Sequence, residues 1–501
     1  MLHIHFLSLV SWLALSVDYA VGQTLEASSR NIATLLANTG VKWASQTSIT
    51  FPGDAGFKAA TLRWTVFRPP TYQAAISPST ENDVVNAVRL ARDNNIPFLG
   101  TGGRHGYGTT LGTLQNGLAL DLSKLNSVSV DKAAGTLTVG PGVHFEDIFD
   151  PVFKAGYAIP TGSCSCVGMI GATIGAGIGR FSGLYGLLLD QLLSARVVTA
   201  DGRLLTVSAR SNADLFWGIR GAGANLGIVT SATFKLSPLV NGGMFANYDM
   251  IFPAEKNQSY FKAIAALGDG RSALPAKLSM ATAVTYDNVT GRPQILSNWV
   301  YAGSQAEAKQ VIKPILDLQP SFLNASVLPW NKLTAEAGFG LDASLCLNNK
   351  IYDIYGVNLK RLDIPTFMSV FAKMGDFYRA FPDGRGTSLT LEAFPNQATL
   401  ATADAATAYA WRDTKYNILL QFTWDQTNSA VQTPSTQLAL ELRQDFAATS
   451  GYGNLTVYVN YAHGDETTEQ IYRADKLPRL TQLKRKWDPD NVFRFSNALP
   501  M

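Results

Sequence analysis

The sequence predicts an α+β protein made of two structural domains. The chain has 501 residues and 46% of them are hydrophobic, which is enough apolar mass for two cores. From residue 71 to about 236, short apolar segments alternate with glycine turns and a few helical patterns. After Pro238 the segments become longer and amphipathic. This change of pattern predicts a domain boundary near residue 240.

The first region is expected to mix strands and helices. Residues 81–94 predict an amphipathic helix capped by Ser79 or Thr80, and residues 145–154 a second helix. Strands are expected over residues 97–99, 117–121 and 136–139. Glycines are dense between 162 and 186 and between 218 and 227, but apolar residues are interleaved with them. We therefore interpret these stretches as tight, packed turns and not as linkers.

The second region is expected to be rich in strands. Strand patterns cover residues 278–285, 295–301, 388–394, 418–424 and 455–461. The tail predicts a helix that ends before Asp488–Pro489, because the residue before a proline disfavours the helical conformation. The apolar end of the chain is expected to dock back on the first domain.

The N-terminus has the pattern of a secretory signal peptide. Residues 6–17 form an apolar run too short to span a bilayer, and small residues follow at Ala20 and Gly22. We expect cleavage after Gly22, a secreted protein and no membrane segment thereafter. Four N-x-Ser/Thr sequons predict surface glycosylation, at Asn257, Asn288, Asn324 and Asn454.

Charge and cysteine content exclude several classes of protein. The net charge is only +3 and no long basic run occurs, which disfavours nucleic-acid binding; residues 484–486 are interpreted as a solvated helix face. Three cysteines are too few for a disulfide scaffold, and Cys164 and Cys166 are too few for a zinc site, so no metal is expected. A hydrolase is disfavoured because the chain lacks a G-x-S-x-G elbow.

One glycine loop surrounds a histidine. In FLGTGGRHGYG, residues 98–108, a strand leads into five glycines around His105, and successive backbone N–H groups of such a loop can hold a pyrophosphate. None of the glycine-rich loops has the G-x-G-x-x-G spacing. A Rossmann-type dinucleotide site is therefore disfavoured.

Taken together, the motifs point to a family. GGRHGYG at 102–108, GSCSCVGMIGATIGAGIG at 162–179, ADLFWGIRGAGANLG at 213–227, YVNY at 458–461 and KWDPDNVF at 486–493 resemble the berberine-bridge-enzyme-like branch of the vanillyl-alcohol-oxidase flavoproteins. The resemblance implies a PCMH-type FAD-binding domain and a substrate domain whose antiparallel sheet, backed by helices, roofs the flavin. The expected layout is a signal peptide (1–22), an N-terminal segment (23–67), the FAD-binding domain (68–240), the substrate domain (241–460) and a C-terminal segment that returns to the FAD domain (461–501).

The same resemblance implies bicovalent FAD. His105 matches the histidine that bonds the flavin 8α-methyl group, and Cys164 the cysteine that bonds C6, which leaves Cys166 as a bystander. Arg104 stands where many relatives carry a small residue, and Ile178 where plant relatives often have a tyrosine. The other expected cofactor-binding residues are Thr101, Gly102, Gly103, Arg104, Gly168, Gly171, Thr173, Gly177, Val229 and Asn460.

Three positions match the family's active site above the flavin. They are Tyr107, Gln421 and a tyrosine of YVNY, either Tyr458 or Tyr461, of which we prefer Tyr461 as the base. If this segment is a strand, residues 458 and 461 point to opposite faces. A tyrosine can act as base only if its pKa is lowered or a neighbour takes the proton. Glu392 and His463 are further candidates.

The expected reaction is oxidation of a small organic substrate. Hydride passes to FAD, a base accepts the proton, and O₂ reoxidises the flavin to give H₂O₂; Val167 lines the oxygen approach in the resembling family. We favour a specialised-metabolite alcohol or amine as substrate and a monomeric protein. The alternatives are an oligosaccharide oxidase and a flavin-dependent cyclase or dehydrogenase; a non-enzymatic binding protein is disfavoured because His105 and Cys164 are both present.

Overall fold

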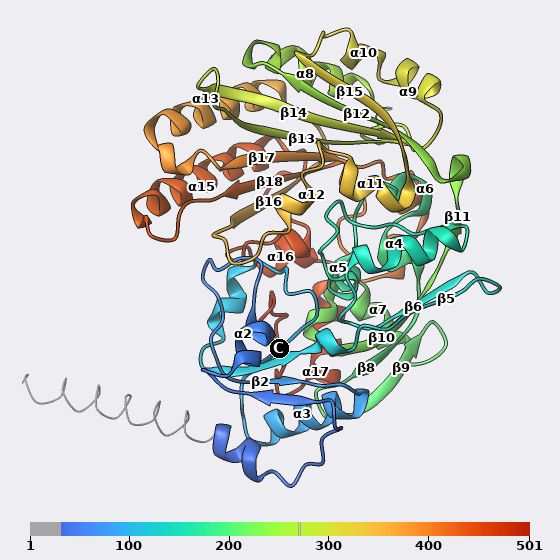
Figure 1. Cartoon of the computed structure of the whole chain (residues 1–501), viewed down its shortest axis with the longest axis vertical. Helices are drawn as coiled ribbons and strands as arrows, with labels where there is room; N and C mark the ends of the chain where they lie inside the picture. Colours follow the sequence, from blue (N-terminus) through green and yellow to red (C-terminus); the bar gives the residue numbers. More distant parts are fainter. Residues whose placement is uncertain (1–31, 269, 271) are drawn as a thin grey trace, which may run out of the picture.

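Two lobes stand one above the other in the computed structural model, which describes residues 32–268, 270 and 272–501 (Figure 1). The predicted signal peptide lies outside the described residues. We call residues 32–243 together with 459–501 the first lobe and residues 244–458 the second lobe. Both combine helices with sheets, which confirms the α+β prediction. Among the described helices, none is both long and apolar enough to cross a bilayer.

The first lobe begins with a four-stranded sheet in the order β1-β2-β4-β3. Strands β2, β4 and β3 run parallel and β1 antiparallel. Helix α3 starts after Thr80, whose hydroxyl accepts the N–H of Asp83, so the predicted helix and its cap are confirmed. The elements are β1 (Ser48–Thr50), α2 (Ala55–Thr61), β2 (Tyr72–Ser77), α3 (Glu81–Asp93), β3 (Phe98–Thr101) and β4 (Gly117–Asp121).

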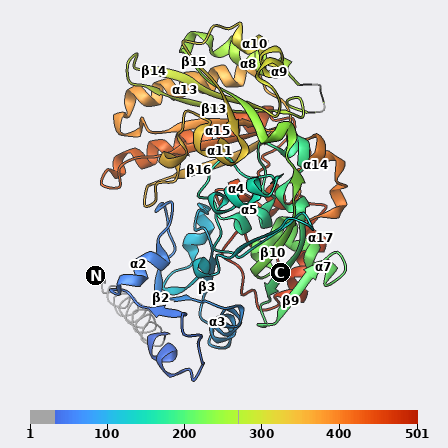
Figure 2. The ribbon, with the colours of Figure 1, turned by 45° about the vertical axis from the view of Figure 1, so that its right-hand side comes forward.

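A five-stranded antiparallel sheet, β5-β6-β10-β8-β9, completes the first lobe. Helices α4 and α5 lie between this lobe and the second (Figure 2). A short pair, β7 with β11, adds a further ribbon. The elements are β5 (Val128–Asp131), β6 (Thr136–Val139), α4 (Phe145–Lys154), β7 (Tyr157–Ala158), α5 (Met169–Gly175), α6 (Ser182–Tyr185), β8 (Leu192–Val198), β9 (Leu204–Ser208), α7 (Ala213–Ala222), β10 (Ile228–Lys235) and β11 (Ser237–Pro238).

The second lobe is a seven-stranded antiparallel sheet in the order β15-β12-β14-β13-β17-β18-β16. The strands are β12 (Met244–Phe252), β13 (Leu278–Asp287), β14 (Arg292–Tyr301), β15 (Phe322–Pro329), β16 (Asp353–Leu359), β17 (Ser388–Ala393) and β18 (Tyr416–Phe422). The helices are α8 (Asn257–Ala266), α9 (Gln305–Val311), α10 (Lys313–Leu316), α11 (Trp330–Glu336), α12 (Asp342–Leu345), α13 (Ile364–Ala380), α14 (Gln397–Ala401) and α15 (Gln432–Thr449).

The two faces of this sheet have different environments. On β17, Leu389, Leu391 and Ala393 join a core with α8, α13 and α15. Side chains alternate along a strand, so Thr390 and Glu392 belong to the opposite face. That face looks toward the first lobe (Figure 1). The sheet can therefore present polar groups to the junction between the lobes.

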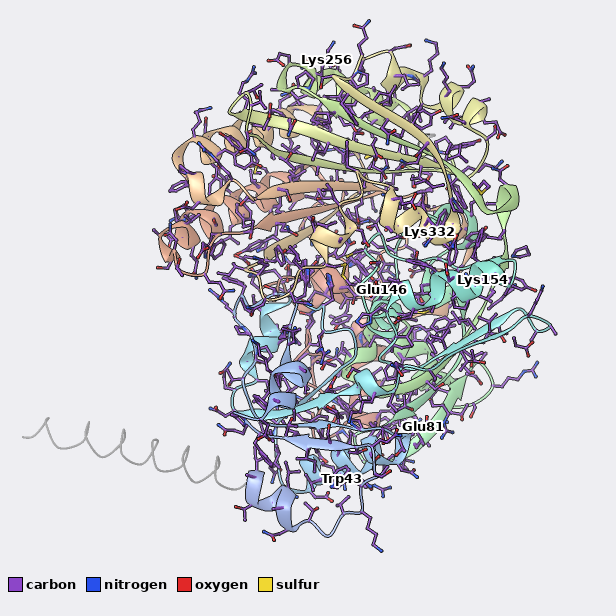
Figure 3. All side chains as sticks on the ribbon, in the orientation of Figure 1. Trp43, Glu81, Glu146, Lys154, Lys256 and Lys332 are labelled. Atoms are coloured by element: carbon purple, nitrogen blue, oxygen red, sulfur yellow. A yellow bond between two sulfur atoms is a disulfide. The ribbon has the colours of Figure 1, made fainter. Side chains whose placement is uncertain are left out.

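The junction itself is packed. Helices α4 and α11 lie side by side there: Asn331 donates to Asp150 Oδ1 at 2.7 Å, and the rings of Phe149 and Trp330 meet edge to face at 5.5 Å. Figure 3 shows Lys332 of α11 close to α4. The junction is thus a continuation of the first lobe's core and not a loose hinge.

Residues 455–461 do not form the predicted strand. They run beside the edge strand β16 and end in a 3₁₀ turn, Val459–Tyr461. The backbone N–H of Asn358 in β16 donates to Thr456 O, as in a regular ladder. The Tyr458 N–H, however, donates to the side-chain oxygen of Asn358 and not to its carbonyl. A side chain in place of the carbonyl interrupts a regular ladder, which explains why an alternating sequence yields a turn here.

The tail returns to the first lobe through α16 (Thr468–Tyr472) and α17 (Leu477–Trp487), and α17 ends where predicted. The expectation of a fully solvated face at residues 484–486 is wrong for Lys484, which is entirely buried. Its ammonium donates to Asp488 at 2.6 Å and to the carbonyls of Asn225 and Phe493. These partners explain how a lysine can be buried inside a basic run.

Candidate active site

Three glycine-containing turns meet where β3 ends. A Cβ atom on Gly102 would lie 2.0 Å from Pro141 O, and one on Gly103 would lie 2.5 Å from the Gly168 Cα. Backbones this close leave room for no side chain, so glycine is required at these positions. Thr101 ends β3 just before this contact. The turns form a cradle of backbone, which fits a pyrophosphate-bearing cofactor.

Arg104 holds the histidine loop in shape. Its φ is +55°, in the left-handed region. Its guanidinium donates to Ala59 O at 2.9 Å and to Asp121 at 3.0 Å, the latter at the end of β4. The structure therefore gives Arg104 a role in anchoring the loop through its side chain.

His105 offers a buried ring nitrogen. Its imidazole stacks on Trp64 with ring centroids 4.1 Å apart. Its Nε2 is buried and has no hydrogen-bond partner among the described residues. Burial lowers the pKa of His105 to about 4, so the ring is neutral at physiological pH. An imidazole nitrogen without a partner fits one that carries a covalent substituent.

Cys164 lies next to His105. Its thiol is half-buried and free, and one ring nitrogen of His105 lies within 4.8 Å of the Cys164 and Cys166 sulfurs. Burial, with the nearby Asp342 carboxylate, raises the pKa of Cys164 to about 12. Positions 8α and C6 belong to the same ring of a flavin, so two covalent bonds there need two adjacent side chains. His105 and Cys164 meet this requirement.

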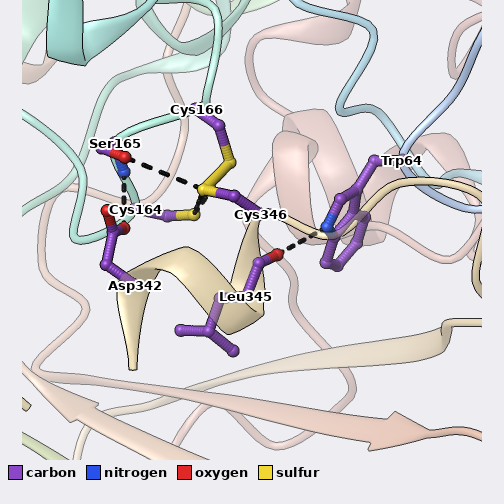
Figure 4. The surroundings of a disulfide bond; sticks show 7 residues. All are labelled: Trp64, Cys164, Ser165, Cys166, Asp342, Leu345 and Cys346. Carbon is purple, nitrogen blue, oxygen red and sulfur yellow. Dashed lines mark hydrogen bonds between the residues drawn. A yellow bond between two sulfur atoms is a disulfide. The ribbon is translucent and has the colours of Figure 1, made fainter. Parts of the chain in front are cut away.

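Cys166 is not the expected bystander. It forms a disulfide with Cys346, across 180 residues, just after α12 (Figure 4). The odd number of cysteines was a signal that one pair and one thiol were possible. The pairing was missed because only the folded chain brings Cys346 to this loop. It also removes two sulfurs from the groups that could otherwise hold a metal, His105–Cys164–Cys166 and Cys164–Asp342–Cys346.

Tyr461 and Glu392 form a hydrogen-bonded pair beside this loop. The Tyr461 hydroxyl donates to Glu392 Oε2 at 2.9 Å, and Ser163, next to Cys164, donates to Oε1 at 3.4 Å. Glu392 is only 5% exposed. Burial raises its pKa to about 7, although the Tyr461 hydroxyl and the Arg180 charge oppose the rise. Burial and the same carboxylate raise the pKa of Tyr461 well above 10.

Arg180 is a charged residue that sequence reasoning missed. Its Nη1 is buried and finds no hydrogen-bond partner in the described part of the chain. Burial lowers the pKa of Arg180 to about 10, opposed by the charges of Glu392 and Asp249. The signal was a lone cation in the apolar, glycine-rich stretch 171–183.

Tyr107 lies in the same aromatic cluster as Trp64 and Tyr461. Its hydroxyl is buried and lacks a partner among residues 32–268, 270 and 272–501. Burial, with Glu392 nearby, raises the pKa of Tyr107 well above 10. A buried hydroxyl without a partner is available to a bound molecule.

Tyr458 is committed to structural hydrogen bonds. Its hydroxyl accepts the N–H of Gly177 at 3.0 Å and the side-chain amide of Asn460 at 2.7 Å. Asn460 also donates to Ala172 O. The expectation that Tyr458 and Tyr461 point to opposite faces is wrong: their rings are 4.8 Å apart, because side chains at i and i+3 eclipse in a 3₁₀ turn.

Gln421 and His463 have different surroundings. Gln421 lies on β18 between Ser388 and Ile354, half-buried, on the face turned to the first lobe. His463 contacts Asp353 at 3.0 Å and Asp465 at 3.1 Å. These carboxylates raise the pKa of His463 to about 9, so it is a cation at neutral pH and a poor proton acceptor.

The remaining expected residues lie in different surroundings. Gly171 is exposed at the start of α5, while the Thr173 hydroxyl donates to Met169 O within that helix. Val229 is buried on β10, and Val167 packs half-buried against the first lobe's core. Of the sequons, Asn288, Asn324 and Asn454 are exposed and Asn257 is half-buried.

Comparisons with known proteins agree with this geometry. Residues 72–208 match the family described as FAD binding domain, and residues 457–500 the family described as berberine and berberine like. The chain is 51% identical to FAD-linked oxidoreductase OXR1 of Pyricularia oryzae over 457 residues, 91% of this chain and 89% of that one. It is 47% identical to FAD-linked oxidoreductase srdI of Neurospora crassa, over 94% of this chain and 93% of that one.

Solved structures share the fold. BBE-like 1 of Physcomitrella patens superposes with a TM-score of 0.79 at 24% identity, covering 91% of this chain and 97% of that one. A chitooligosaccharide oxidase gives a TM-score of 0.78 at 22% identity over the same shares. Glucooligosaccharide oxidase from Acremonium strictum, which has a 6-S-cysteinyl, 8α-N1-histidyl FAD, gives 0.76 at 22% identity, also over 91% and 97%.

Proposed function

Because the chain belongs to the berberine-bridge-enzyme-like family of FAD-linked oxidoreductases, we propose that it oxidises a small alcohol or amine with FAD bonded to His105 and Cys164 and with O₂ as the electron acceptor. The observation that carries the proposal is that the two groups able to bond the flavin lie close to a pair of side chains able to accept a proton. The unpartnered His105 nitrogen and the free Cys164 thiol lie in the glycine cradle, and Ser163 links that loop to the Tyr461–Glu392 pair.

The residues of the first lobe fit FAD. The backbone around Gly102, Gly103 and Gly168 would hold its pyrophosphate, and His105 and Cys164 would bond its ring. Bound there, FAD supplies the two-electron acceptor for the oxidation. Two bonds to the protein keep such a ring in place while substrate and product exchange.

The proton of the substrate O–H or N–H goes to the Tyr461–Glu392 pair. Tyr461 alone is a weak base because its pKa is raised, which makes a free tyrosinate costly. Its hydroxyl proton already points at Glu392 Oε2. As Tyr461 takes the substrate proton, its own proton passes to Glu392. A carboxylate with a pKa of about 7 can accept and release this proton near neutral pH.

Arg180 tunes this acceptor. A buried carboxylate is costly unless a cation is near. The Arg180 charge favours the ionised form of Glu392 and so keeps it able to accept a proton. Without Arg180, the pKa of Glu392 would rise further and the acceptor would be protonated at neutral pH.

The substrate is proposed to be a specialised-metabolite alcohol or amine. The relatives at 44–51% identity are named only as FAD-linked oxidoreductases. Both substrate classes occur on this fold: 6-hydroxy-D-nicotine oxidase at 23% identity and xylooligosaccharide oxidase at 22%. An oligosaccharide substrate is therefore the second candidate, and cyclisation or dehydrogenation with another acceptor the third.

Secretion and glycosylation complete the proposal. The Cys166–Cys346 disulfide supports folding in an oxidising compartment, where such bonds persist. Three of the four sequons are exposed, which leaves them accessible to glycosylation. The predicted signal sequence over residues 1–22 points the same way.

A substrate panel tests the reaction. Purified protein is mixed with alcohols, amines and oligosaccharides, and H₂O₂ release is followed together with anaerobic bleaching of the flavin. We expect a yellow protein that one of the alcohols or amines bleaches, with H₂O₂ formed once air is admitted. A colourless protein without flavin would exclude the proposed function, whereas turnover of oligosaccharides alone would favour the second candidate.

A further inference from the structure

Three sulfurs lie together beside the proposed flavin site. Cys164 Sγ is 3.5 Å from Cys166 Sγ and 3.6 Å from Cys346 Sγ, the two atoms of the disulfide (Figure 4). A thiolate displaces a disulfide sulfur by attack in line with the S–S bond. The two nearly equal distances place Cys164 beside the bond and not along its axis. This geometry, with a thiol that burial keeps protonated, preserves one free thiol next to one disulfide.

The pairing decides which sulfur can bond the flavin. Cys164 and Cys166 are two residues apart in one loop, and Cys346 comes from the second lobe. We propose that the Cys166–Cys346 disulfide is a guard: it keeps Cys166 from bonding the flavin and Cys346 from pairing with Cys164, and so leaves Cys164 as the thiol that bonds flavin C6. This inference rests on the proposed function, which names Cys164 as the site of attachment.

The competing pairing would block attachment. Attack of a Cys164 thiolate on Cys346 Sγ would form Cys164–Cys346, break Cys166–Cys346 and release Cys166 as a thiolate, which takes up the proton that Cys164 lost; no oxidant is consumed. Attachment is a different reaction. The Cys164 sulfur replaces hydrogen at C6, and the two protons and two electrons released are taken up by O₂, which becomes H₂O₂.

The segment that carries Cys346 is positioned by contacts other than the disulfide. Asp342 Oδ1 accepts the Ser165 N–H at 2.9 Å. Leu345 O accepts the Trp64 indole N–H at 2.7 Å, and Trp64 stacks on His105. Helix α12 thus contacts the Cys164 loop directly and reaches His105 through Trp64. Cys346 is expected to stay near Cys164 even when Cys166 is removed.

The test compares Cys166→Ser with the double variant Cys166→Ser/Cys346→Ser. Each full-length protein, free of flavin, is first incubated with glutathione disulfide, and FAD is added afterwards. The glutathione disulfide supplies the oxidant: two protein thiols become a disulfide as it becomes two glutathione thiols. Alkylation and peptide mass spectrometry then locate free thiols, disulfides and flavin. In Cys166→Ser we expect Cys164 to pair with Cys346 before FAD is added, so that its bond to flavin does not form in most molecules. The double variant should recover that bond.

A purely structural role for the disulfide predicts that the double variant does not recover the flavin bond. If the disulfide only braces the fold, the double variant will be no better than Cys166→Ser, and this would overturn the inference. So would a Cys166→Ser protein that keeps flavin on Cys164 with Cys346 unpaired. FAD retained on His105 serves as the check of folding in each variant.

A further variant, Cys346→Ser, and the wild-type protein complete the test. If Cys166→Ser does not accumulate, Cys346→Ser removes the guard instead, and flavin should be found on Cys166 as well as on Cys164; flavin on Cys164 alone would contradict the inference. If the wild-type protein carries no flavin on Cys164, the proposed attachment fails. The disulfide map of Cys166→Ser still reports the pairing in that case.

Discussion

At the scale of single residues, burial shifts the pKa values of several side chains in the site. Burial raises the pKa of Glu392 to about 7 and lowers that of His105 to about 4. A buried group with a strongly shifted pKa and a defined charge partner is typical of functional sites. Glu392 has such a partner in Arg180, and it bonds Tyr461 directly.

Proton transfer through Tyr461 and Glu392 predicts a specific pH dependence. Only ionised Glu392 accepts a proton, so flavin reduction should rise with pH through about 7 and level off above it. Glu392→Gln should remove that rise, and Tyr461→Phe should slow reduction by about 10²- to 10⁴-fold. Anaerobic stopped-flow measures both. Tyr286→Phe, on β13 beside Tyr378, is the control; a Glu392→Gln profile that still rises near pH 7 would contradict the assignment.

The family resemblance predicts that Val167 lines the approach of oxygen to the flavin, and this role stays a prediction. Val167 is half-buried against the first lobe's core, and one added methylene can close a narrow passage in a close-packed wall. Val167→Leu should slow reoxidation by about tenfold or more, an increase of about 1.4 kcal/mol in the barrier, and leave reduction unchanged. The two half-reactions are measured separately by stopped-flow. If Val167 is only a packing residue, overpacking costs about 1–3 kcal/mol of stability and reoxidation stays at its wild-type rate.

Sequence reasoning at this scale reached residues with local motifs and missed those without them. His105 and Cys164 stand in distinctive glycine loops, and the structure brings them together. Arg180 and Cys166 also stand in glycine-rich stretches, but their roles depend on Glu392 and Cys346, which come from elements far away in the chain. The roles of Tyr458 and Tyr461 depend on whether their segment is a strand or a turn. The Asn358 side chain of β16 favours the turn, and the local sequence does not reveal this contact.

At the scale of elements, the C-terminal helix α17 depends on a buried ion pair. Lys484 and Asp488 are both fully buried, 2.6 Å apart, and Asp488 also accepts the N–H groups of Val492 and Phe493. Removing one partner of such a pair leaves an uncompensated charge. Helix propensity and the following proline predicted where α17 ends, but the burial of one lysine in a basic run followed only from its tertiary contacts.

This pair predicts a large difference between two similar substitutions. Lys484→Met should lower the free energy of unfolding by about 3–5 kcal/mol, because Asp488 stays buried without its cation. Lys486→Met, whose lysine is 58% exposed and pairs with Asp214, should change it by about 1 kcal/mol or less. Denaturant unfolding compares the two. Equal effects would show that Lys484 contributes no more than a surface charge.

At the scale of the whole molecule, function follows from how the lobes meet. The first lobe supplies the cradle with His105 and Cys164, and the sheet of the second supplies Glu392. The tail adds Tyr461, which bonds Glu392 across the junction. The α+β class and seven of the 18 described strands, namely β3, β4, β6, β13, β14, β17 and β18, could be predicted from periodicity and turn residues. The strand order and the junction could not, because they depend on contacts between distant segments.

The proposed function depends above all on FAD held at this junction by two covalent bonds. Peptide mass spectrometry of the acid-precipitated protein tests it most directly, on the wild type and on His105→Ala, Cys164→Ala and the double variant. We expect flavin on both the His105 and the Cys164 peptides of the wild type, on one peptide in each single variant, and released flavin in the double variant. Wild-type protein whose FAD comes off on denaturation, with both peptides unmodified, would contradict it.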